Sequence, residues 1–165
     1  TGEQQSMALL CMALHELGVN ARSFSGQQAG IITDSLFGSA RITGVTPTRL
    51  IEALNSLDAV VVAGFQGVNQ DADLTTLGRG GSDTTAVALA AALGLKECEI
   101  YTDTDGVYTT DPHLVPEARK LDRIDFDEML ELASQGARVL DSRSVWYARH
   151  YLVTLRQSTK NSLLE

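Results

Sequence analysis

The chain has 165 residues, 44% of them hydrophobic and 21% charged, with a formal net charge of −8 at pH 7. This composition excludes a disordered chain, and an acidic balance argues against a general nucleic-acid binder, which carries a basic face. The length suits one domain with its own core, over residues 1–165. No apolar run approaches the ~20 residues of a membrane-spanning helix, so we expect a cytoplasmic protein without membrane or nucleic-acid partners. Cys11 and Cys98 lie in apolar stretches without metal-ligand spacing, so we expect buried thiols and no protein metal site.

The first half of the chain predicts two helices separated by short strands. Thr46 and Pro47 have the residue types of a helix cap and first turn. Two strands flank a polar turn at Gly38, the pattern of a β-hairpin. In chain order we expect a helix, a strand, the two hairpin strands and a helix over residues 3–17, 21–24, 31–34, 40–43 and 46–57.

The second half alternates strands and helices. Asp125 and Glu128 form a capping box, which predicts a helix start. We expect strands over residues 59–63, 98–102 and 152–156 and helices over 83–93, 125–135 and 142–151. Alternation of this kind predicts an α/β fold, an αβα sandwich around a mainly parallel sheet. Residues 157–165 are polar and aperiodic, and we interpret them as a loose tail.

The segment from Thr75 to Ala86 is the most informative part of the chain. Its residues 78–81, Gly-Arg-Gly-Gly, place one cation among three glycines directly before a helix of small residues. Glycine lets the backbone approach a ligand, and the helix start offers unpaired N–H groups to an anion such as phosphate. The planar guanidinium of Arg79 suits a carboxylate or phosphate, whereas the structural alternative is a solvated surface arginine.

Other candidate side chains have equally good structural explanations. Asp83 could organise cations at the helix start, but it could also be a cap, as could Ser82, Thr84 and Thr85. Asp103 and Asp105 follow a strand, at the end where open α/β sheets bind ligands, yet turn formation explains both. Tyr108 could stack on a ring, and Glu3 could simply complement a helix dipole.

Four runs of the chain closely resemble the catalytic domain of the aspartate kinases, members of the amino-acid kinase superfamily. They cover residues 61–67, 75–86, 99–112 and 128–133, and the run Leu-Gly-Arg-Gly-Gly-Ser-Asp-Thr-Thr is highly specific. The similarity extends from Thr1 to about Tyr151. It implies a three-layer αβα sandwich of the amino-acid kinase type, here incomplete.

The resemblance also implies an activity. Aspartate kinases transfer a phosphoryl group from ATP, accompanied by Mg²⁺, to the side-chain carboxylate of L-aspartate. The product is 4-phospho-L-aspartate, and the step opens the route to lysine, threonine and methionine. A homo-oligomer, or association with the remainder of an enzyme, is implied as well.

The resemblance assigns roles to individual residues of this chain. Arg79 would clamp the α-carboxylate of aspartate, Glu3 would receive its amino group, and Ser82 would belong to the same substrate site. Asp83 would organise the cations around the transferring phosphoryl group. The nucleotide would be bound by Gly80, Gly81, Thr102, Asp103, Asp105, Tyr108 and Arg138, the last at a position where the family often has a phosphate-binding lysine.

Departures from the family pattern keep two alternatives open. Family members begin with a strand and a Lys-Phe-Gly-Gly-Thr/Ser loop, and regulatory ACT domains follow; this sequence contains neither. One alternative is therefore a catalytically inactive fragment or engineered scaffold that binds nucleotide weakly. The other is a related kinase of the acetylglutamate or glutamate branch.

The lysine-bearing loop supplies backbone donors and a cation to the phosphates, so we expect this chain alone to form no measurable aspartyl phosphate. A coupled ADP-release or hydroxamate assay with L-aspartate tests this, and robust turnover contradicts it. A melting temperature that responds to ATP or ADP but not to aspartate favours the scaffold. Competition among small amino acids in the same assay separates the related kinases.

Overall fold

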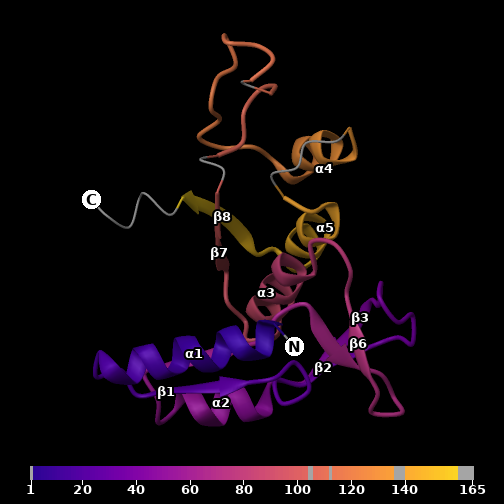
Figure 1. Cartoon of the computed structure of the whole chain (residues 1–165). Coiled ribbons are helices and arrows are strands. Elements are labelled where there is room, and N and C mark those ends of the chain that lie inside the picture. Colours follow the sequence, from indigo (N-terminus) through magenta and orange to yellow (C-terminus); the bar gives the residue numbers. More distant parts are fainter. Residues whose placement is uncertain (1, 104–105, 112, 136–139, 160–165) are drawn as a thin grey trace.

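The computed structural model describes residues 2–103, 106–111, 113–135 and 140–159, which form helices and short strands in alternation (Figure 1). The helices are α1 (Gly2–Glu16), α2 (Thr48–Leu54), α3 (Gly81–Ala92), α4 (Phe126–Ser134) and α5 (Ser142–Tyr151). The strands are β1 (Ala21–Phe24), β2 (Ile31–Thr33), β3 (Ile42–Val45), β4 (Ala59–Val62), β5 (Gln66–Val68), β6 (Leu74–Thr76), β7 (Glu97–Thr102) and β8 (Thr154–Thr159).

The strand pairing confirms the α/β class. Three pairs are parallel, β1 with β4, β2 with β5 and β7 with β8, whereas β2–β3 and β5–β6 are antiparallel. The strands do not join into the one central sheet that we expected. Among the described residues they form three sheets, β1–β4, β3–β2–β5–β6 and β7–β8. Among the described strands, β4 pairs with β1 alone and β7 pairs with β8 alone, so no hydrogen-bonded strand links the β1–β4 sheet to the β7–β8 sheet.

Helix α3 connects the two hydrophobic clusters of the molecule. The first cluster gathers side chains such as Phe24, Ile31 and Leu50 around the strands of the N-terminal half, with α1 on one side of the β1–β4 pair and α2 on the other (Figure 1). The second lies beneath α4 and α5. Ala88 of α3 belongs to the first cluster, and Ala86 packs against the second. Small side chains thus fix α3, and with it the position of its N-terminus, from two sides.

Most predicted helices are confirmed, with one wrong cap. The carboxylate of Asp125 accepts a hydrogen bond from the N–H of Glu128 at 2.8 Å, which confirms half of the predicted capping box. Thr46 does not cap α2, because Pro47 is the N-cap residue and no side chain caps that end. The N–H of Thr46 instead donates to the carbonyl of Gly30 at 2.9 Å, which holds Thr46 at the end of the hairpin.

The strand predictions fail where strands are short or begin after an unusual backbone turn. No sequence pattern predicted β5 and β6, which are three-residue strands with few apolar residues. The last strand starts at Thr154, because Leu152 adopts a left-handed conformation that ends α5. It continues to Thr159, so residues 157–159 pair with β7 and do not belong to a tail.

The structure also bears on the cysteines and on the expectation that no helix spans a membrane. Cys11 is buried and Cys98 is half-buried, and both thiols are free. In the described ranges, no helix combines the length and apolarity that crossing a membrane requires.

A buried hydroxyl pair offers a test of the packing around the central strands. Thr33 and Thr75 are both buried, and their hydroxyl oxygens lie 2.6 Å apart; Thr33 also donates to the carbonyl of Asp34 at 2.9 Å. Thr33→Val leaves the buried Thr75 hydroxyl without its hydrogen-bond partner and should lower the free energy of unfolding by about 1–3 kcal/mol. Thr75→Val should cost less, because Thr33 keeps its carbonyl partner. Urea unfolding of the single and double variants measures this, and strictly additive losses contradict the pairing.

Candidate functional site

The glycine-rich segment leaves β6 and turns directly into α3. Gly78 and Gly80 both have left-handed backbone angles, φ +74° and +68°. A side chain is disfavoured in that region, which explains two of the three glycines. The segment is held by hydrogen bonds from the N–H of Leu77 to the carbonyl of Phe65 and from Gly81 to Gly78, both at 3.0 Å. We call residues 77–81 the glycine loop.

The start of α3 is not capped by any side chain. Gly80 is the N-cap residue, so Asp83 lies in the first turn and is not a cap. The hydroxyls of Thr84 and Thr85 do not cap either, since they donate back to the carbonyls of Gly80 and Gly81 at 3.1 and 2.7 Å. No hydrogen bond from the N–H groups of Ser82 or Asp83 occurs among the described residues. These donors, with the positive end of the helix dipole, are open to an anion.

A second loop, between β4 and β5, lies against this helix start. A Cβ on Gly64 would meet the Cα of Ser82 at 3.4 Å, and one on Gly81 would press on Phe65 at 2.8 Å. Phe65 has a left-handed backbone (φ +68°), unusual for a bulky residue, and its N–H donates to the Thr85 hydroxyl at 3.1 Å. The two loops therefore fix each other, and backbone strain at such a position is typical of ligand sites.

The first turn of α1 contacts the residue that follows this second loop. The side-chain amide of Gln4 donates to the side-chain oxygen of Gln66 at 2.7 Å. Glu3, the predicted partner of an amino group, lies in the same turn and is half-buried. The structure thus connects α1 with the strand that leads out of the site, although no measured contact joins Glu3 to Arg79.

The predicted polar side chains of the glycine loop and of the first turn of α3 differ in their surroundings. Arg79 is exposed, and its guanidinium forms no hydrogen bond or ion pair within the described part of the chain. Ser82 is exposed, whereas Asp83 is half-buried. Burial raises the pKa of Asp83 above its ordinary value, and the nearby carboxylate of Asp141 raises it further. The site therefore holds a free cation on one side and a carboxyl group that resists ionisation on the other.

Sequence reasoning missed Asp141 and Arg143, which reach this loop from α5. The guanidinium of Arg143 donates to the carbonyl of Leu77 at 2.6 Å and to the carbonyl of Arg79. The same side chain pairs with Asp141 at 3.3 Å. Asp141 can be identified from sequence as a helix cap. No local pattern, however, reports a contact across more than 60 positions of the chain.

Most of the predicted nucleotide residues lie at the C-terminal end of β7 and in the segment that follows it. Thr102 ends β7, and its hydroxyl donates to the carboxylate of Asp103 at 3.1 Å. Tyr108 is half-buried and forms an isolated bridge with Lys120. Asp105 and Arg138 lie outside the described residues. Gly80 and Gly81, the remaining predicted nucleotide residues, lie in the glycine loop, and no hydrogen bond or ion pair joins that loop to the described residues Thr102, Asp103 or Tyr108.

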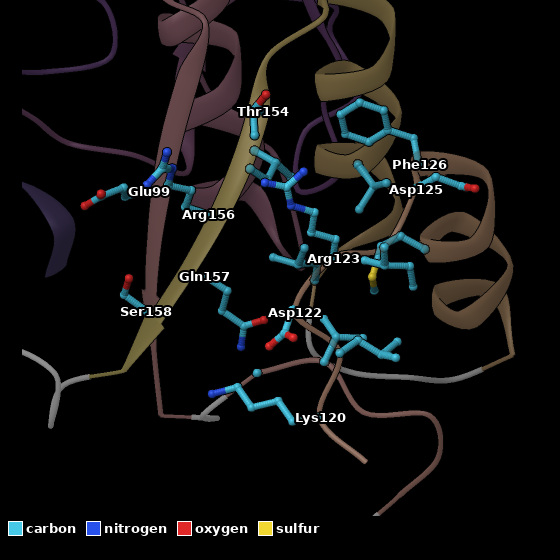
Figure 2. Close-up of a pocket in the computed structure, with 18 of the residues that line it drawn as sticks. Glu99, Lys120, Asp122, Arg123, Asp125, Phe126, Thr154, Arg156, Gln157 and Ser158 are labelled. Atoms are coloured by element: carbon cyan, nitrogen blue, oxygen red, sulfur yellow. The ribbon is translucent and has the colours of Figure 1, made fainter. Parts of the chain in front are cut away.

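A large cavity lies between the β7–β8 pair and the segment that leads into α4 (Figure 2). Its volume is about 1020 Å³, and it contains charges of both signs, with Arg156 paired to Glu97 at 2.9 Å. Gly106 and Val107, which precede Tyr108, contribute to its wall, but none of the predicted site residues that the structure describes does. The cavity therefore differs from the open helix start in both place and charge. In the described ranges no group of three or more His, Cys, Asp or Glu side chains could hold a metal ion.

Asp83 gives the site a pH-dependent cost in stability. A carboxyl group with a raised pKa holds more protons in the folded chain than in the unfolded chain, so the free energy of unfolding falls as pH rises from 3.8 through the raised value. Asp83→Asn should therefore raise the melting temperature at pH 7 and lose this gain below pH 4. Scanning calorimetry across this range measures it. The exposed control Asp71→Asn should show no such trend, and a gain independent of pH for Asp83→Asn contradicts the assignment.

The sequence and the structure of this chain are similar to those of known proteins. Residues 1–155 match the Amino acid kinase family. The chain is 61% identical over 155 residues to an aspartokinase of Thermus thermophilus, covering 94% of this chain and 38% of that protein. Among solved structures it resembles E. coli aspartokinase III in complex with aspartate and ADP, with a TM-score of 0.89, 34% identity and coverage of 97% of this chain and 36% of that one.

A second solved structure, aspartate kinase from Synechocystis, has a TM-score of 0.80 and 49% identity, and the match covers 96% of this chain and 26% of that one. The chain thus spans little more than a third of the length of the curated relatives it matches. The family match covers nearly all of the chain, and the structural likeness agrees with it. The chain belongs to the amino acid kinase family.

Proposed function

We propose that this chain is part of an aspartate kinase, which transfers a phosphoryl group from ATP to the side-chain carboxylate of L-aspartate. The observation that carries the proposal is the glycine loop, in which Arg79 stands between two left-handed glycines at the uncapped start of α3. Similarity supports it: a relative with 61% identity is named aspartokinase, and the E. coli aspartokinase III structure was solved with aspartate and ADP.

The geometry suits phosphoryl transfer to a carboxylate. Such a reaction depends on positioning and on neutralising charge, and a carboxylate substrate is already a nucleophile that needs no general base. We assign the exposed guanidinium of Arg79 to the α-carboxylate of aspartate and Glu3 to its amino group. One charge for each end of a free amino acid favours aspartate over N-acetylated substrates. Ser82, exposed at the helix start, belongs to the same substrate site.

Asp83 and the helix start would face the phosphates. Mg²⁺ is typically held by one or two carboxylates together with substrate phosphates. The half-buried Asp83, with Asp141 nearby, fits that role, since a cation would offset the repulsion that raises its pKa. When bound, Mg²⁺ neutralises charge on the transferred phosphoryl group. The N–H groups of Ser82 and Asp83 add a further positive potential.

We assign the nucleotide to the residues around the end of β7 and to the glycine loop. Thr102, Asp103 and Tyr108 supply polar and aromatic contacts, Gly80 offers its backbone N–H, Gly81 lets the ligand approach the backbone closely, and Asp105 and Arg138 complete the group. The proposed product is 4-phospho-L-aspartate, whose formation is the first step towards lysine, threonine and methionine. The proposal also includes a cytoplasmic location, and either a homo-oligomer or association with the remainder of an enzyme.

Ligand binding to the chain tests the assignment of Arg79. Arg79→Gln should weaken L-aspartate about 10- to 100-fold in isothermal titration, because a hydrogen-bonded ion pair is lost, while Mg²⁺–ADP binding changes little. Arg79→Lys should recover part of the loss. Arg49→Gln, an exposed arginine on α2, is the matched control. Absence of aspartate binding to the unmodified chain, or tighter binding of N-acetyl-L-glutamate or L-glutamate, contradicts the proposal.

A further inference from the structure

Arg143 joins the first turn of α5 to the glycine loop. Its guanidinium donates to two carbonyls of that loop, on Leu77 at 2.6 Å and on Arg79. Its Nε donates to the Asp141 carboxylate at 3.3 Å, and the same oxygen accepts the backbone N–H of Arg143 at 3.0 Å. One half-buried guanidinium therefore holds two of the five carbonyls of the loop, and a carboxylate fixes its orientation.

These hydrogen bonds determine where the loop directs its N–H groups. In a trans peptide the carbonyl and the N–H of the following residue point in opposite directions, and no peptide among the described residues is cis. Holding the carbonyls of Leu77 and Arg79 towards Arg143 therefore turns the N–H groups of Gly78 and Gly80 away from it. Gly80 is left-handed and Gly81 is helical, a combination that gathers N–H groups into an anion-binding concavity.

Asp141 adds a steric constraint from the same helix. A Cβ on Gly80 would overlap the Asp141 side chain, so α5 and the loop are in close contact at the N-cap of α3. The carboxylate of Asp141 also balances the charge of Arg143. The contact is thus shaped to hold a backbone conformation, and the guanidinium is occupied by protein groups and not offered to a ligand.

We propose that Arg143 is a positioning residue that holds the glycine loop in its ligand-binding conformation through the carbonyls of Leu77 and Arg79. The nature of the ligand rests on the proposed function, since aspartate and the nucleotide are the groups assigned to this loop. Arg143 itself touches neither. A role confined to capping α5 is separable, because the cap bond uses the backbone N–H of Arg143, which every substitution except proline retains.

The loop conformation can be tested without any ligand, by NMR of the ¹⁵N-labelled chain. Arg143→Gln should shift or broaden the amide resonances of Gly78, Gly80 and Gly81 while those in the middle of α5 stay in place. Arg149→Gln, on the same helix and paired with the exposed Asp127 at 2.9 Å, is the matched control and should leave the loop unchanged. Loop resonances identical to those of the unmodified chain overturn the proposal.

The consequence for binding is measured by titration with L-aspartate and with Mg²⁺–ADP. Arg143→Gln should weaken both about tenfold although Arg79 is intact, as loss of a supporting contact typically does. Arg143→Lys, which keeps the charge and some donors, should recover part of the affinity. Unchanged affinities with an altered loop also overturn the positioning role. If the unmodified chain binds neither ligand, the proposed function fails, and the resonances alone decide whether Arg143 holds the loop.

Discussion

The site depends on the backbone at Gly80, the residue immediately before α3. Its left-handed conformation sends the chain from a strand into a helix without a capping side chain, so the N–H groups of Ser82 and Asp83 in the first turn of α3 stay open. The same turn places Arg79 on the surface and Asp83 in the half-buried first turn. A Cβ on Gly80 would overlap the side chain of Asp141 at the start of α5, and one on the next residue, Gly81, would press on Phe65. A side chain at Gly80 would therefore strain the backbone and disturb the contact with Asp141.

The core determines where that turn lies. Helix α3 consists largely of alanine and other small residues, and it touches both hydrophobic clusters of the molecule. Such a helix can pack closely on two sides, which leaves little freedom for its N-terminus to shift. The arrangement resembles that of many ligand sites, in which loops carry the chemistry and rigid elements hold them.

The charges at the site show a conflict between stability and ligand binding. Asp83 and Asp141 lie close enough that burial and repulsion raise the pKa of Asp83, which costs stability near neutral pH. Under the proposed function, a cation bound beside Asp83 would offset part of that cost. Arg143 has the opposite role, since its charge is satisfied by Asp141 and by two backbone carbonyls. Arg79, by contrast, is exposed and forms no hydrogen bond or ion pair with the residues that the structure describes.

The sequence by itself determined the α/β class, the five helices that the structure describes and the hairpin, and it marked the segment from Thr75 to Ala86 as a candidate site. These features follow from local causes: apolar periodicity, a capping carboxylate at Asp125, and glycines where the backbone needs positive φ. It did not reveal β5 and β6, because three-residue strands with few apolar side chains carry no periodic signal. Nor did it reveal that the described strands pair into three separate sheets, which depends on which strand edges meet in space.

Only the tertiary structure showed that Thr84 and Thr85 bond to their own turn, and that Arg143 reaches the glycine loop from α5. Arg143 lies at the start of the helix predicted over residues 142–151, but the direction of its guanidinium depends on how α5 packs against α3. Local backbone preferences are encoded in neighbouring residues. Contacts between distant segments arise from packing of the whole core, and a single sequence contains no short-range pattern that specifies them.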